Sequence, residues 1–177
     1  MKEQLQKDFK NIIENLNLSQ KDIEIKKFYL DNFINRGFPN RKEEDWKFSD
    51  LNQIIKKNIG ELSFYSDYTS TNKVDTSVFV DGLEHNKIVF INGRIEKIDF
   101  DYEKKNQIEI IDQTESINKF NNNNALSDLN NAFTNKSFKV LVKKGYQLAK
   151  PLIIYHTTNS KIWSKNINLR LDFELDK

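Results

Sequence analysis

The pattern that most constrains the fold is a strict alternation of apolar and polar residues over 167–175, close to the end of the 177-residue sequence. The apolar side chains share one face of a predicted strand, and the polar ones share the other. The apolar residues are Ile167, Leu169, Leu171, Phe173 and Leu175. Such a face must pack against a second layer, and we expect these 177 residues not to complete that layer. The strand is therefore predicted to belong to a larger β structure.

Further strands are predicted before this one. Residues 88–91 and 94–98 are β-rich and flank Asn92-Gly93, the strongest two-residue hairpin signal, because both turn positions require positive φ. Short strands are also expected at 108–111 and at 138–142, with a turn at 143–145. Residues 152–155 form a continuous apolar run after Pro151, which predicts a strand buried on both faces.

The first third of the chain shows helical spacing instead. Apolar residues recur every three or four positions in two stripes, one from Leu5 to Leu16 and one from Ile25 to Phe33. Ser19 is placed to cap the second helix, and Gly37 to end it. Asn40 with Glu43 has capping-box spacing and predicts a short helix, and Ser49 is expected to cap another.

The predicted fold class is α+β, with three consecutive segments. Residues 1–58 form a helical domain, 59–136 form a mixed connection with a β-hairpin and a short helix at 125–133, and 137–177 begin a β core. A polar run at 121–124 is predicted to be a loop.

Composition excludes several classes of protein. The chain has no cysteine, which removes disulfides, thiolate metal sites and Cys nucleophiles from its residues. Its net charge of +2 disfavours general nucleic-acid binding. No apolar run is long enough to span a membrane, and the N-terminus lacks the apolar core of a secretory signal. We therefore predict a cytoplasmic protein.

Few residues suggest chemistry. His85 and His156 have no partner at metal-ligand spacing, and no phosphate-binding loop or nucleophile elbow occurs. Trp46 and Trp163 are predicted to be core or interface anchors. Lys143, Lys144 and Lys150 are too few for nucleic-acid binding and are interpreted as a solvated turn. The residues themselves thus predict a non-catalytic domain that packs against another structure.

Four blocks of the sequence resemble the SufD family in the same order. The first is GFPNRKEEDWKFSDL, which is similar to the N-terminal signature of that family. The other blocks are 89–95 around Asn92-Gly93, 125–133, and 140–156 around Gly145 and Pro151. The positions that match the signature are Pro39, Arg41, Lys42, Glu44, Trp46 and Lys47. The resemblance runs from about residue 25 to the end.

This resemblance implies a non-catalytic scaffold subunit of iron–sulfur cluster assembly. Members of the family have a helical N-terminal domain, a central right-handed parallel β-helix and a C-terminal helical region. They pair with a homologous SufB-like subunit and with a SufC-like ATPase, and the complex builds the cluster. The strands of 137–177 would then be the first rungs of a truncated β-helix, and the cluster-related and ATPase-binding parts would lie beyond this sequence.

No catalytic, metal or cofactor-binding residue is transferred from the family to this chain. Pro39, Arg41, Glu44, Trp46 and Lys47 are interpreted as structural. Two alternatives remain open. One is a protein–protein interaction module with a helical arm, unrelated to cluster assembly. The other is a small enzyme that uses carboxylates such as those of Glu43 and Asp45, which would require an apolar cleft around Trp46.

Overall fold

The computed structural model describes residues 2–60, 62–66, 72–114 and 124–175. It divides into two compact units, each built from segments that are not consecutive. The helical unit consists of Met1–Ser66, Thr114–Asn135 and Ser164–Arg170, and the β unit consists of Asp67–Gln113, Lys136–Trp163 and Leu171–Lys177. The predicted α+β class is confirmed. The boundaries after residues 58 and 136 stay a prediction.

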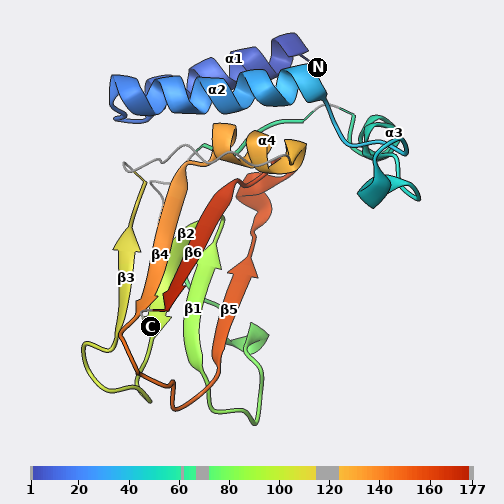
Figure 1. The fold of residues 1–177 in the computed structure, drawn as a ribbon. Helices are drawn as coiled ribbons and strands as arrows, with labels where there is room; N and C mark the ends of the chain where they lie inside the picture. The colour runs from blue at the N-terminus through green and yellow to red at the C-terminus, as the bar shows by residue number, and fades with distance from the viewer. Residues whose placement is uncertain (1, 61, 67–71, 115–123, 176–177) are drawn as a thin grey trace. The chain divides into compact units, whose positions relative to one another are not determined.

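The helical unit contains four α-helices (Figure 1): α1 (Lys2–Asn15), α2 (Gln20–Arg36), α3 (Leu51–Asn58) and α4 (Ala125–Phe133). The capping predicted for α2 is confirmed, because the Ser19 hydroxyl accepts a hydrogen bond from the amide of Asp22. The helix ends at Gly37, whose φ of 74° is accessible to glycine at little cost. Helix α4 covers the predicted residues.

Two predictions in the segment between α2 and α3 are wrong. The helix expected after Asn40 is a single 3-10 turn, η1 (Glu44–Trp46), although the Asn40 amide does donate to the Glu43 carboxylate over 3.1 Å. Asp50, not Ser49, caps α3, accepting from the amide of Gln53. The Ser49 amide instead bonds to the carbonyl of Trp46, so Ser49 belongs to the preceding turn.

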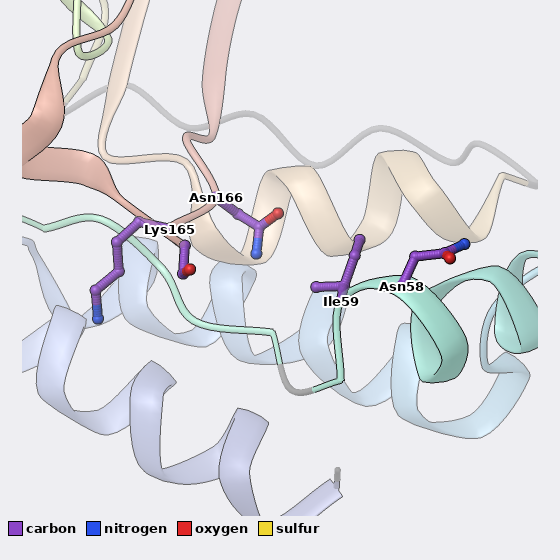
Figure 2. A pocket seen from close by; sticks show the side chains of 5 residues that line it. Asn58, Ile59, Lys165 and Asn166 are labelled. Carbon is purple, nitrogen blue, oxygen red and sulfur yellow. The ribbon is translucent and has the colours of Figure 1, made fainter.

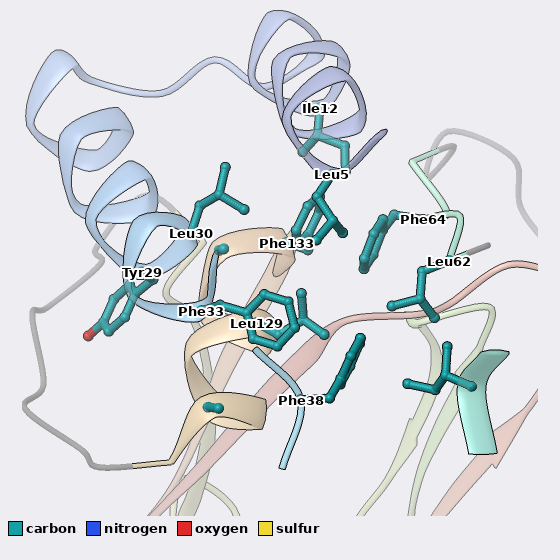
Figure 3. Packing of buried hydrophobic residues seen from close by; sticks show 13 residues of the cluster. Leu5, Ile12, Tyr29, Leu30, Phe33, Phe38, Leu62, Phe64, Leu129 and Phe133 are labelled. Atoms are coloured by element: carbon teal, nitrogen blue, oxygen red, sulfur yellow. The ribbon is translucent and has the colours of Figure 1, made fainter. Parts of the chain in front are cut away.

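Aromatic side chains dominate the core of the helical unit. Phe64 and Phe133 stack with ring centroids 3.7 Å apart, and Phe33 meets Phe38 edge to face at 4.9 Å (Figure 3). The buried ammonium of Lys26 donates to the carbonyls of Asn131 and Thr134 at the end of α4. These contacts fasten α2 to α4. The buried residues of this core are Leu5, Ile12, Tyr29, Leu30, Phe33, Phe38, Ile55, Leu62, Phe64, Ala125, Leu129, Ala132 and Phe133.

The β unit contains a first sheet with the strand order β2-β1-β5. Strands β1 (Asn86–Ile91) and β2 (Arg94–Asp99) form the predicted antiparallel hairpin, and both turn residues, Asn92 and Gly93, have positive φ. Strand β5 (Leu152–Thr157) pairs with β1 in parallel. A short 3-10 helix, η2 (Thr76–Val78), precedes this sheet, and η3 (Ser160–Ile162) follows β5.

A second sheet has the order β3-β4-β6. Strands β3 (Ile108–Asp112) and β4 (Lys136–Val142) are antiparallel, and β6 (Leu169–Leu175) runs in the same direction as β4 in Figure 1. The rings of Phe90 on β1 and Phe138 on β4 lie 5.9 Å apart, so the two sheets share an apolar interior. Along the chain, β4, β5 and β6 therefore fall in the second, first and second sheet.

The prediction that residues 152–155 are buried on both faces is wrong. Strand β5 is an outer strand of its sheet, and Ile154 is 39% exposed. Strand β6 begins at Leu169 rather than at residue 167, and it is also an outer strand. Residues 121–123 of the predicted loop lie outside the described residues. The described strands form two small mixed sheets, and the finer prediction of β-helix rungs remains a proposal.

Candidate interaction surface

The segment of 37–51 that carries the SufD-like signature connects α2 to α3 in the helical unit. Phe38 is only 2% exposed, and Pro39 beside it is also buried. The carbonyl of Pro39 accepts a hydrogen bond from the amide of Leu51 over 3.2 Å, which closes the segment into a compact loop. These contacts explain the local fold without any ligand.

The remaining signature residues point to solvent. Arg41, Glu44 and Lys47 are exposed, and Trp46 is half-buried. Glu44 and Lys47 form an ion pair of 3.7 Å along the 3-10 turn, which at this exposure is worth little. The structural interpretation of these positions stays a prediction, because burial accounts only for Pro39.

The carboxylates considered for catalysis lie on the same exposed loop. Glu43 and Asp45 are both exposed, and Glu43 is engaged by the amide of Asn40. Phe48 is 86% exposed, with the Lys47 ammonium 5.2 Å from its ring centroid. A carboxylate acts as a catalytic acid or base where a dry environment shifts its pKa, and this loop offers none around Glu43 and Asp45.

The structure gives His85 a structural role. Its ring is 2% exposed, with Nδ1 2.6 Å from the carbonyl of Leu83 and Nε2 2.7 Å from the hydroxyl of Tyr155. A carbonyl only accepts, so Nδ1 carries the proton and Nε2 accepts from Tyr155. The same hydroxyl accepts from the amide of Val80. The imidazole thus fastens the segment before β1 to strand β5.

His156 lies on β5, and its described surroundings are those of an ordinary strand residue. Its ring is 6.0 Å from the ring of Phe90, and partial desolvation lowers the pKa of the imidazole below its usual 6.5. Within 2–60, 62–66, 72–114 and 124–175, no group of three or more His, Cys, Asp or Glu side chains could hold a metal ion. The expectation that the chain has no resident metal stays a prediction.

Glu103 is the most connected carboxylate of the β unit, and nothing in the sequence pattern singled it out. It accepts hydrogen bonds from the hydroxyl of Tyr146 at 2.6 Å, from the amides of Ala149 and Lys150, and from the side chain of Asn86. Burial alone would raise the pKa of Glu103, but these four donors lower it from 4.5 to about 2. Its role is to fix the loops around it.

Exposed apolar side chains occur on all four outer strands, including Ile98 of β2 and Ile111 of β3, and they are most exposed on β6. Phe173 and Leu175 are 52% and 67% exposed, and Ile154 is 39% exposed. Trp163, which follows η3, is 83% exposed, so the predicted anchor lies on the surface of the β unit. Outer strands also leave backbone donors and acceptors available for pairing. Strands β5 and β6 are the candidate interaction surface of the chain.

A hollow of about 310 Å³ lies in the helical unit between the end of α3 and residues 164–166 (Figure 2). Asn58, Ile59, Ser164, Lys165 and Asn166 line it. Lys165 donates to the hydroxyl of Ser63. The described lining residues include no carboxylate or imidazole, so they do not supply an acid–base pair.

None of the described helices has the length and apolar character needed to cross a membrane.

Comparison with known proteins adds no assignment. No protein-family model matches this chain, and no curated protein matches it either.

Proposed function

We propose that this chain is a non-catalytic scaffold component of iron–sulfur cluster assembly, of the SufD kind. The observation that supports it best is the path of β4, β5 and β6 through the second, first and second sheet. A parallel β-helix follows this path, because each coil contributes one strand to each sheet and pairs with the previous coil. Strand β5 lies beside β1 in parallel, as a second coil would.

The exposed outer strands support the same proposal. A solenoid buries a continuous core only when successive coils or a partner cover each other, so β5 and β6 are suited to receive further strands. In this proposal the partners are a SufB-like homologous subunit and a SufC-like ATPase, in the cytoplasm. The iron–sulfur cluster is the cargo of the whole complex, and this chain contributes no catalytic residue and no cofactor ligand.

A chimera tests the proposal. Residues 1–175 replace the corresponding N-terminal part of a SufD subunit in a bacterium that depends on this assembly system. We expect the chimera to copurify with SufB and SufC and to restore the activity of iron–sulfur enzymes. A chimera that is folded by circular dichroism and copurifies with neither subunit would refute the proposal. A second chimera with β6 register-shifted by one residue is the control, because it turns the apolar face outward.

The alternative is an interaction module unrelated to cluster assembly, and one observation favours it. Phe48, Ile54 and Ile59 are 86%, 43% and 56% exposed around α3, a surface that the scaffold proposal does not use. Hydrogen exchange on the isolated chain separates the two functions. Full protection of 169–175 in a proven monomer favours the self-contained module, whereas rapid exchange there favours a scaffold that needs a covering layer.

A further inference from the structure

Two β-turns that begin with Lys-Lys occur at one end of the β3–β4 pair. In the first, the carbonyl of Lys104 accepts from the amide of Gln107 over 3.3 Å. In the second, the carbonyl of Lys143 accepts from the amide of Tyr146 over 3.0 Å. The first turn leads into β3 and the second follows β4, so Figure 1 shows both loops at the same end of these strands. We call these residues, 104–107 and 143–146, the paired lysine turns.

Direct contacts hold the paired lysine turns side by side. The carbonyl of Gln107 accepts from the amide of Lys143 over 3.0 Å, which extends the antiparallel β3–β4 ladder by one step. The amide of Lys104 donates to the hydroxyl of Tyr146 over 3.0 Å. Asn106 and Gly145 occupy the third position of their turns with φ of 62° and 69°, so both turns have the left-handed residue in the same place. The two Lys-Lys pairs are consequently presented in a fixed arrangement.

The charges on this surface are not neutralised within it. Lys104, Lys105, Lys143 and Lys144 are all exposed, and none of them forms an ion pair with a described residue. The carboxylate of Glu103 is occupied by Tyr146, Ala149 and Lys150 of the facing loop and by Asn86 of β1. Lys150 is paired with Glu84 at 2.7 Å, and Asp101 is the other exposed acid of the first loop. Four lysines therefore project from two adjacent turns, while the exposed carboxylates of Asp101 and Glu109 in the neighbouring segments of the chain form no ion pair with them.

We propose that the paired lysine turns bind a short acidic segment of a protein partner, whose Asp and Glu side chains lie across both turns. Adjacent strands are about 5 Å apart, so one short extended peptide can cross both Lys-Lys pairs. A nucleic acid fits less well, because the turns carry four lysines and no arginine. Tyr146, the aromatic residue within the turns, is half-buried and its hydroxyl is bonded to Glu103, so it offers no stacking platform.

Fluorescence anisotropy of a labelled hexapeptide of alternating Glu and Asp, titrated with the full chain, tests this proposal. We expect binding at low ionic strength that weakens as salt is added. Replacing Lys143 and Lys144 by Gln should weaken binding about three- to tenfold, the range expected for the loss of two exposed charge contacts. Lys56→Gln with Lys57→Gln is the matched control, because it removes the same dipeptide charge at the end of α3 and should leave the affinity unchanged.

Three results would overturn the proposal. One is the absence of peptide binding by the unmodified chain at low salt. Another is an equal loss of affinity in the two double variants, which would make the binding a property of net charge. The third is tighter binding of a single-stranded oligothymidylate of equal charge, reduced by the same turn substitutions. Should the 143–144 variant fail to fold by circular dichroism, Lys104→Gln with Lys105→Gln provides the same test. The proposal does not depend on the scaffold function.

Discussion

Replacing Glu103 by glutamine tests how far one carboxylate holds the β unit together. The Oε1 atom of Glu103 accepts from Asn86 and Lys150, the Oε2 atom accepts from Tyr146, and the amide of Ala149 is shared between both oxygens. Glutamine has a single side-chain acceptor, and its amide group would face a donor on the other side. Glu103→Gln therefore removes the charge and one of the two acceptor atoms that the four donors share.

The size of the effect follows from the pKa of Glu103. A fall from 4.5 to about 2 corresponds to at most about 3.4 kcal/mol of stabilisation by the ionised form, at about 1.4 kcal/mol per pH unit. Glu103 is partly exposed, so solvent screening reduces the expected value to about 1–2 kcal/mol. Because the folded pKa is the lower one, this stabilisation is complete above about pH 4.5 and is lost as the pH falls towards 2.

Urea unfolding of the full chain at several pH values measures this contribution. At pH 7 the Glu103→Gln variant should unfold with a free energy about 1–2 kcal/mol below that of the unmodified chain, and the difference should shrink towards pH 3. Glu109→Gln, which changes an exposed glutamate on β3, is the control and should leave the unfolding free energy unchanged. Equal unfolding free energies of Glu103→Gln and the unmodified chain at pH 7 would refute the reasoning.

Three further substitutions probe the two cores. Desolvation lowers the pKa of Lys26 from 10.5 to about 8, so the stability of the chain should rise between pH 8 and pH 10.5, and Lys26→Met should flatten that rise in urea unfolding. Phe133→Ala removes the ring stacked on Phe64 and should cost about 3–5 kcal/mol, measured by thermal unfolding; a loss below about 1 kcal/mol would contradict the packing described. Tyr155→Phe leaves Nε2 of His85 without its donor and should lower the free energy of unfolding by about 1–3 kcal/mol, measured with urea. An unchanged unfolding midpoint would show that this hydrogen bond does not stabilise the fold.

Local signals in the sequence predicted local structure well. Ser19 caps α2 as its side chain and position suggest, and Asn92-Gly93 forms the hairpin turn because both residues adopt positive φ. The apolar spacing of 125–133 also predicts α4 in full. In each case the residues that determine the element are close in sequence, with successive ones at most four positions apart, so tertiary contacts are not needed to recognise it.

Predictions failed where neighbouring residues competed for one role. Ser49 and Asp50 are both good N-caps, and only the hydrogen bond of the Ser49 amide to the carbonyl of Trp46 gives the cap to Asp50. Glu103 was not recognised, and the partner of His85 was not identified, for another reason. Their partners Tyr146 and Tyr155 are distant in the sequence, and a polar residue in a loop carries no periodic signal.

The order of the strands within each sheet could not be predicted from the sequence, although the proposed function depends on which strands are outer strands. An apolar run such as 152–155 is compatible with a central or an outer strand, because length and hydrophobicity say nothing about which neighbours are present. The structure makes β5 and β6 outer strands with Ile154 and Phe173 exposed. Proteins usually protect such edges with charges, prolines or a covering element. On β6, Glu174 pairs with Lys139 of β4, and Arg170 and Asp172 add further charges to the strand. Under the proposed scaffold function, the free edges of β5 and β6 are where a further strand would pair.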